Sequence, residues 1–282
     1  MNKILFLATL FGRFICFSQV QVFEKNISND EVFGMSISPD GEEMLFVRAY
    51  GGRDSLQIFQ SVKEGDDWSD PKKASFSIDG INQIDPSYSP DGRLILINMI
   101  KEEENGYDVY VMERTKSGLG DLRDLSASVN TEAHEFYATM SKNGNVYFTR
   151  RNNSNDIYMS QWDGTKYLKA IPLSFNTDNS ESNPYIHPQE KFVIFTSKTD
   201  NTQGVDLFIS FKKRNKWSNP INLGKPVNSS LNEFCPSIDL KNKRFLFSRT
   251  EVLENRRIEN MFFIPLKDLN IKNLRKQASY PD

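Results

Sequence analysis

The sequence predicts an all-β fold, a five-bladed β-propeller of four-stranded antiparallel blades, and three observations lead to this prediction. A turn motif recurs at a nearly constant spacing, an apolar strand follows each copy, and aromatic residues, which favour strands, are frequent, with 21 Phe and 10 Tyr. Of the 282 residues, 38% are hydrophobic and 26% are charged, which is the composition of a folded globular protein. All-β folds of this length often form one domain.

The turn motif is Ser38-Pro39-Asp40-Gly41, and it recurs as Ser89-Pro90-Asp91-Gly92. Degenerate copies begin at Ser141, His187 and Asp239, so successive copies start 51, 52, 46 and 52 residues apart. This period fits one propeller blade of four strands. Because Pro fixes φ for a turn and Gly accepts positive φ, we expect the motif to connect the innermost strand of each blade to the second strand.

Each copy of the motif is followed by an apolar second strand and, after a polar loop, by a third strand. The second strands are expected at 44–47, 94–97, 146–148, 192–195 and 245–247. The third strands are expected at 58–61, 108–111, 156–159, 206–209 and 260–263. The fourth strand follows Trp-Ser-x-Pro in two repeats, at Trp68 and Trp217. The approximate repeat boundaries are therefore 30–79, 80–129, 130–177, 178–228 and 229–270.

Closure of the ring depends on the fourth strand of the last blade. The fifth repeat has no clear fourth strand of its own, whereas residues 20–29 resemble the fourth-strand segments of the other repeats. We therefore predict that the N-terminal strand completes the last blade, which also removes exposed sheet edges. The rival interpretation places that strand at Ile271–Ala278, and a ring of six blades is the alternative to five.

Residues 1–18 have the layout of a secretory signal peptide, and residues 19–282 are expected to form a single propeller domain. Asn2-Lys3 gives a basic start, an apolar run follows, and cleavage is expected near Ser18–Gln19. The segment is too short to span a membrane, and no later segment qualifies. The protein is therefore expected to be periplasmic or secreted. In a lipoprotein interpretation, Cys16 would instead be the acylated residue.

Removal of the leader would leave Cys235 as the only cysteine, so no internal disulfide is expected. We interpret Cys235 as a small buried apolar residue. A catalytic thiol would need a base, and the chain offers only His134 and His187.

The Ser-Pro-Asp-Gly turn, the Asp-Ile-Tyr strand and the Trp-Ser-x-Pro-x-Asn-Leu-Gly segment resemble the WD-like repeats of TolB-type propellers. The resemblance covers roughly residues 31–266. It implies a propeller fold. TolB-like propellers usually have six blades, and TolB also carries a separate N-terminal domain, so the five repeats found here depart from that pattern.

Polar residues recur just before the innermost strands, and they are the candidate ligand-binding residues. The set comprises Glu31, Gln83, Glu135, Glu181 and Glu233. Equivalent positions of a propeller form a ring around its axis, so these side chains could converge at one mouth of the channel and bind a cation, an amine or a polar sugar. The alternative interpretation is that each one caps backbone amides where its blade begins.

The composition and motifs favour binding over catalysis. With a net charge of −2 and no basic stripe, no nucleic-acid partner is expected. The chain lacks a Gly-rich phosphate loop, a Gly-x-Ser-x-Gly elbow and a Cys-x-x-Cys pair, and neither a metal nor a cofactor is predicted.

The sequence thus predicts an exported, monomeric, non-catalytic binding module that contacts a protein partner or a cell-envelope polysaccharide through one propeller face. The alternative is a carbohydrate-active hydrolase or lyase with acidic residues at the axial mouth. A glycosidase would need two carboxylates at a defined separation.

Overall fold

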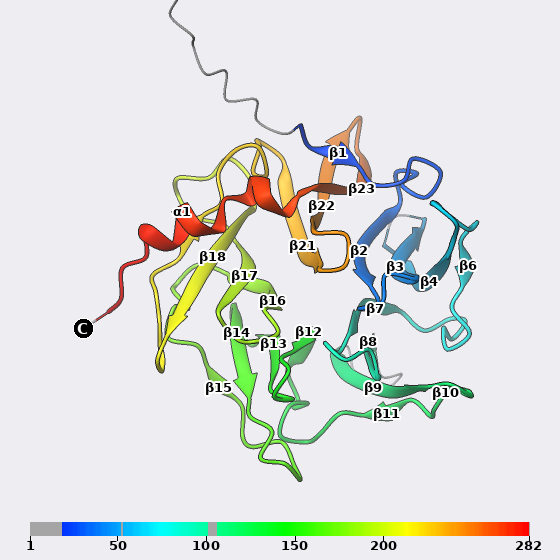
Figure 1. Cartoon of the computed structure of the whole chain (residues 1–282), viewed down its shortest axis with the longest axis horizontal. Coiled ribbons are helices and arrows are strands. Elements are labelled where there is room, and N and C mark those ends of the chain that lie inside the picture. Colours follow the sequence, from blue (N-terminus) through cyan, green and yellow to red (C-terminus); the bar gives the residue numbers. More distant parts are fainter. Residues whose placement is uncertain (1–18, 52, 101–105, 282) are drawn as a thin grey trace, which may run out of the picture.

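The structure, a computed structural model, describes residues 19–281 except 52 and 101–105. Five antiparallel sheets stand in a ring, which confirms the predicted five-bladed propeller (Figure 1). Each sheet contributes its first strand to the centre of the ring. The predicted third strands all lie within observed third strands.

The strands of each blade are given in chain order. The first blade contains β2 (Val32–Ile37), β3 (Glu43–Tyr50), β4 (Ser55–Glu64), β5 (Asp67–Trp68) and β6 (Lys72–Lys73). The second contains β7 (Gln83–Tyr88), β8 (Leu94–Ile100), β9 (Tyr107–Thr115), β10 (Gly118–Leu119) and β11 (Arg123–Asp124). The third contains β12 (His134–Met140), β13 (Val146–Arg151), β14 (Asn155–Ser160) and β15 (Ile171–Pro172). The fourth contains β16 (Ser182–Ile186), β17 (Phe192–Ser197), β18 (Asp206–Lys213), β19 (Lys216–Trp217) and β20 (Ile221–Asn222). The fifth contains β21 (Asn232–Asp239), β22 (Arg244–Leu253), β23 (Arg256–Pro265) and β1 (Gln21–Val22).

The repeated turn is stabilised by its own side chains. The Ser38 hydroxyl donates to the Asp40 carboxylate at 2.5 Å and accepts from the Glu43 amide at 3.0 Å, and Gly41 has φ of +80°. Ser89 and Asp91 repeat the first contact at 2.7 Å. All five turns lie on one face of the ring, which we name the turn face. The opposite face, where each innermost strand begins, is the loop face.

The ring is closed by the N-terminal strand, as predicted. In β1, Gln21 pairs with Phe263 and Val22 with Phe262 of β23, and the Phe23 amide donates to the Met261 carbonyl at 2.8 Å. The rival segment is not a strand, because residues 266–269 form the 3-10 helix η1 (Leu266–Leu269) and the next residues form helix α1 (Ile271–Lys276).

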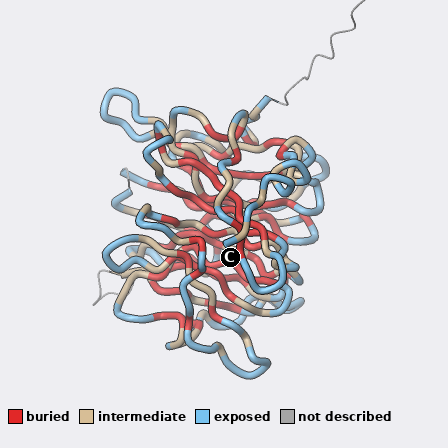
Figure 2. The backbone as a smooth tube through the Cα atoms, turned by 90° about the vertical axis from the view of Figure 1, so that its left-hand side faces the viewer, coloured by how far each residue is buried: buried red, intermediate tan, exposed pale blue. Residues whose placement is uncertain are grey.

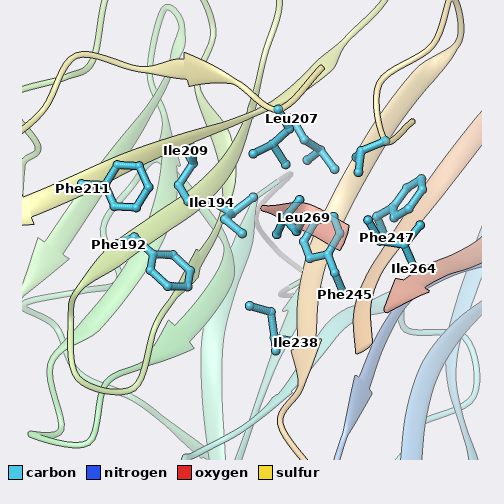
Figure 3. Close-up of a cluster of buried hydrophobic side chains, with 12 residues drawn as sticks. Phe192, Ile194, Leu207, Ile209, Phe211, Ile238, Phe245, Phe247, Ile264 and Leu269 are labelled. Atoms are coloured by element: carbon cyan, nitrogen blue, oxygen red, sulfur yellow. The ribbon is translucent and has the colours of Figure 1, made fainter. Parts of the chain in front are cut away.

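Apolar side chains of neighbouring blades pack against each other. The residues of the innermost strands are buried or partly buried, and none is exposed (Figure 2). Figure 3 shows one such cluster, in which Ile194 and Leu207 of the fourth blade face Phe245 and Ile264 of the fifth. Leu269 of η1 completes this cluster, which explains why the C-terminal segment folds back over these two blades. Neither helix in the described part of the chain has the length and apolar character that a membrane span requires.

Candidate functional site

The predicted acidic ring consists largely of residues that bond to their own blade. The Glu135 carboxylate accepts from the amide of Thr131 at 3.0 Å and from its hydroxyl at 2.7 Å. Glu181 accepts in the same way from Thr177, and Glu233 from Ser229. The side chains of all three glutamates are buried.

Further partners occupy the remaining oxygen positions of these carboxylates. The Arg150 guanidinium donates to Glu135 at 2.6 Å, and Arg249 donates to Glu233 at 2.7 Å. Glu181 has a serine hydroxyl in place of the arginine, and burial raises its pKa. Carboxylates bonded in this way have little capacity left for a ligand.

The other two predicted members differ from the glutamates. Gln83 is buried, and its amide oxygen accepts from the Ile78 amide at 2.6 Å. In the first blade the equivalent place is taken by Val32, and Glu31 lies one residue earlier with an exposed side chain. A ligand-binding role for the five residues stays a prediction. The contacts favour the alternative interpretation, in which these side chains cap backbone amides.

A second ring, two residues further along each innermost strand, lies at the propeller axis. Every innermost strand has a register shift here, and the shifted residue has a positive φ between 50° and 64°. The ring consists of Gly34, Asp85, Tyr137, Asn183 and Cys235. We name these five residues the axial ring.

Three of the five β-bulges are supported by a side chain of the preceding blade. The Gly34 amide donates to the Ser248 hydroxyl, and the Tyr137 amide to the Asn98 side-chain oxygen, both at 2.9 Å. The Asn183 amide donates to the Thr149 hydroxyl at the same distance. A bulge re-aims its side chain, and these contacts fix that direction.

The side chains of the axial ring converge. The Cys235 thiol lies 3.9 Å from the Asp85 carboxylate, and the Asn183 amide nitrogen lies 3.9 Å from the same sulfur. The Tyr137 hydroxyl donates to the carbonyl of Pro236 at 2.8 Å, so it is already engaged. Asp85 is therefore the one carboxyl group in this ring.

A cavity of about 80 Å³ extends from the axial ring to the turn face. Serine and threonine residues line its wall, and its rim is formed by apolar turn residues such as Pro39 and Leu240. Among the described residues that line it, Asp85 carries the only carboxyl group and no residue is basic. We name this space the axial cavity.

The axis is closed on the loop-face side of the ring. Phe33, Ile84, Phe136 and Phe234 pack together with Cys235 and Tyr137 in one apolar cluster. The Arg53 guanidinium lies 4.4 Å from the centre of the Phe33 ring and pairs with Glu259 at 2.6 Å. The axial cavity is therefore a blind pocket with Asp85 at its closed end.

Burial dominates the electrostatics of the ring. It raises the pKa of Asp85 to about 7, although the nearby Arg53 acts in the opposite direction. Burial also raises the pKa of the Cys235 thiol, which keeps the thiol protonated and unreactive. Cys235 is 2% exposed, so the predicted buried position is confirmed.

The two histidines lie on opposite faces of the propeller. His187 lies in a turn of the turn face, where its Nδ1 accepts from the Gln189 amide and its ring packs against Phe192. His134 opens β12, at the loop face. Within residues 19–281, apart from those left undescribed, no group of three His, Cys, Asp or Glu side chains is arranged to hold a metal ion.

The axial ring was missed by the sequence analysis, although a signal exists. Each member stands four residues before the first residue of a turn motif, and three of them, Asp85, Asn183 and Cys235, directly precede a proline. The same position of the repeat is thus occupied by five different residue types, which shows that the blades have diverged there. Such a position marks a candidate site better than the glutamates, which recur in three blades.

Comparison with known proteins gives the fold. No family profile and no curated protein sequence matches the chain. Among solved structures, TolB from Acinetobacter baumannii is 14% identical, with a TM-score of 0.50 over 82% of this chain and 54% of that chain. This chain thus spans about half the length of that relative.

Two further structures cover more of their own length. A TolB from Agrobacterium tumefaciens is 18% identical, with a TM-score of 0.54 over 78% of this chain and 70% of that chain. The GH43 endo-arabinanase from Bacillus licheniformis is 11% identical, with a TM-score of 0.54 over 84% of this chain and 94% of that chain. TolB proteins and an endo-arabinanase share this architecture, so the similarity establishes the propeller fold and does not assign a function.

Proposed function

We propose that this protein is an exported, monomeric, non-catalytic binding module that receives a cationic side chain of a protein partner in its axial cavity. The observation that carries the proposal is the position of Asp85, a single carboxyl group at the closed end of a blind pocket. A buried carboxylate without a bound cation is costly, and an incoming ammonium or guanidinium group would offset that cost.

The size of the cavity favours one side chain over a whole ligand. Sites for small molecules enclose roughly 300 to 1,000 Å³, and the axial cavity measures about 80 Å³. Its apolar rim suits the aliphatic stem of a lysine, and the polar residues Ser87 and Ser237 lie along its wall. A peptide segment resting on the turn face could therefore insert one residue.

In the part of the chain that the structure describes, the axial cavity does not have the pair of carboxylates that a glycoside hydrolase commonly uses. Hydrolysis of a glycosidic bond by the common mechanisms uses two carboxylates on opposite sides of the bond, and one carboxyl group lines the axial cavity among the described residues. The buried thiol of Cys235 has no basic partner there. The geometry thus supports recognition without covalent chemistry.

Export is proposed from the N-terminal sequence, since residues 1–18 lie outside the described residues. Supporting it, β1 begins at Gln21, directly after the expected cleavage point near Ser18–Gln19. Determination of the N-terminal residue of the mature protein, together with its mass in solution by light scattering, tests cleavage and the monomeric state.

Two matched peptide pools test the binding proposal. They differ only in a central residue, lysine in one pool and norleucine in the other, and affinity is measured by fluorescence anisotropy. We expect the wild-type protein to prefer the lysine pool, increasingly so from pH 6 to pH 8 as Asp85 ionises. Asp85→Asn removes the preference, whereas the exposed control Asp66→Asn keeps it. Equal binding of both pools by the wild type contradicts the proposal.

A further inference from the structure

A second concave site lies on the turn face, between the second and third blades. This interblade groove, of about 830 Å³, is formed by β9, β11 and the hairpin of residues 161–167. Its volume falls within the range of small-molecule sites. It adjoins the axial cavity, because Ser89, Pro90 and Met140 line both spaces. The inference drawn from it rests on other residues and is independent of the proposed function.

The hairpin of the third blade departs from the other hairpins at several aligned positions. In three blades a buried serine donates to the carbonyl eight residues later, and this contact aligns the hairpins; the pairs are Ser61 and Ser69, Ser160 and Leu168, and Ser210 and Ser218. In this alignment Tyr167 takes the place of Trp68 and Trp217. Trp162 takes the place of Lys63 and Lys212.

The exchange replaces a cation with an indole. In the first and fourth blades the lysine ammonium lies over the tryptophan ring, at 5.0 Å for Lys63 and 5.4 Å for Lys212. In the third blade the rings of Trp162 and Tyr167 lie 4.9 Å apart at 57°. Both are partly exposed, whereas Trp68 and Trp217 are 5% exposed. An aromatic pair thus borders the groove.

Trp162 is held firmly in place. Its amide donates to the Asn145 side-chain oxygen at 2.9 Å, and its ring lies so close to Gly144 that a Cβ there would stand 3.1 Å from it. The indole is therefore a rigid platform that needs little ordering when a ligand binds.

Cations surround this platform. Arg123, Lys142 and Lys166 line the groove with exposed side chains, and none of the three forms an ion pair with another of the described residues. The other two arginines of the groove are already paired with carboxylates. Burial raises the pKa of Tyr167 to about 12, so its hydroxyl remains a hydrogen-bond donor.

We infer that the interblade groove binds an acidic saccharide, with one sugar ring on Trp162 and a carboxylate at Arg123, Lys142 and Lys166. The apolar C–H face of a pyranose matches a single exposed ring, and arginine matches a carboxylate. Glu113 also lines the groove and can accept from sugar hydroxyls, but it would repel a phosphate dianion. The tilt between the two rings leaves no parallel slot for a flat base, which disfavours a nucleotide.

The probe is a linear oligomer of galacturonic acid, with the neutral galactose oligomer as its matched control. Binding is followed by calorimetry and by the change in tryptophan fluorescence. We expect the acidic oligomer to bind and the neutral one to bind at least tenfold more weakly. Lack of measurable binding, equal affinity for both oligomers, or tighter binding of a nucleotide would overturn the inference.

Matched variants locate the site. Trp162→Lys restores the residue found in the first and fourth blades, so it should fold, and we expect it to lose at least tenfold in affinity and the fluorescence change. Arg123→Gln should weaken binding of the acidic oligomer similarly. Lys216→Gln, a lysine of the fourth blade, and Asp85→Asn should bind like the wild type. Unchanged affinity in Trp162→Lys would overturn the assignment.

Discussion

At the scale of the residue, Asp85 combines a proposed binding role with a cost to folding. Its pKa is about 7 in the folded protein and near 3.8 in an unfolded chain, because burial disfavours the charged form. Between these pH values the folded state holds a proton that the unfolded state has lost. This contribution to stability therefore decreases as the pH rises from 3.8 towards 7.

Asp85→Asn should consequently stabilise the protein at neutral and alkaline pH. We expect a gain of about 4 kcal/mol at pH 8 that shrinks towards pH 4, since the amide carries no charge at either pH. Urea unfolding at a series of pH values measures it. A variant that is less stable than the wild type at pH 8, or a gain independent of pH, would contradict this account.

Glu233 illustrates the opposite kind of buried carboxylate. It bonds to the amide and hydroxyl of Ser229 and to Arg249, so Glu233→Ala would leave a buried donor and a cation without a partner. We expect a loss of about 3 kcal/mol in the free energy of unfolding. Glu31→Ala is the control, because Glu31 is exposed, and it should change stability by less than about 0.5 kcal/mol. Similar losses in both variants would refute the capping role.

At the scale of the element, a strand of only two residues closes the ring. β1 has two paired residues, yet Phe23 and Ile27, which follow it, are fully buried against the first and fifth blades. Side-chain packing next to the strand therefore contributes more to closure than the strand's own hydrogen bonds do.

Phe23→Ala should destabilise the protein by about 3 to 5 kcal/mol, through lost burial and the cavity left behind. Val22→Ala, in the neighbouring exposed position, should cost less than about 1 kcal/mol. Denaturant midpoints of the two variants give the comparison. Equal effects would mean that the strand pairing, and not the packing of Phe23, closes the ring.

The elements that the sequence predicted correctly are those with local signals. The Ser-Pro-Asp-Gly turns carry their own hydrogen bonds, and the apolar second and third strands are long enough to be recognised. Fourth strands such as β6 and β15 pair over only two residues, so their extent has no such signal.

The axial ring could not be read from strand periodicity. An unbroken strand alternates its side chains between two faces, but each innermost strand contains a bulge that breaks this alternation. Which side chain faces the axis thus depends on a register shift that the amino-acid pattern does not state. The predicted glutamates were located at the start of the right strands, two residues from the ring.

At the scale of the whole molecule, every blade shares its apolar side chains with its neighbours. Each pair of neighbouring blades is joined by a hydrophobic cluster, and one of these clusters joins the fifth blade to the first. A blade separated from the ring would expose both faces of its sheet. We expect folding to be cooperative across all five blades.

Equilibrium unfolding should therefore show one transition. Trp68, Trp162 and Trp217 report on the first, third and fourth blades, so tryptophan fluorescence and far-ultraviolet circular dichroism should give the same midpoint. In Phe23→Ala both midpoints should move together. Separate transitions for the two signals would show that the blades unfold independently.

The pairing of β1 with β23 also determines when the ring can close during synthesis of the chain. A chain that is synthesised or passed through a membrane from its N-terminus presents β1 first and its partner strand almost last. Until residues near Phe263 emerge, the first blade has no fifth blade to pack against, and the ring stays open. The protein therefore acquires its final stability only when nearly all of the chain is available for folding.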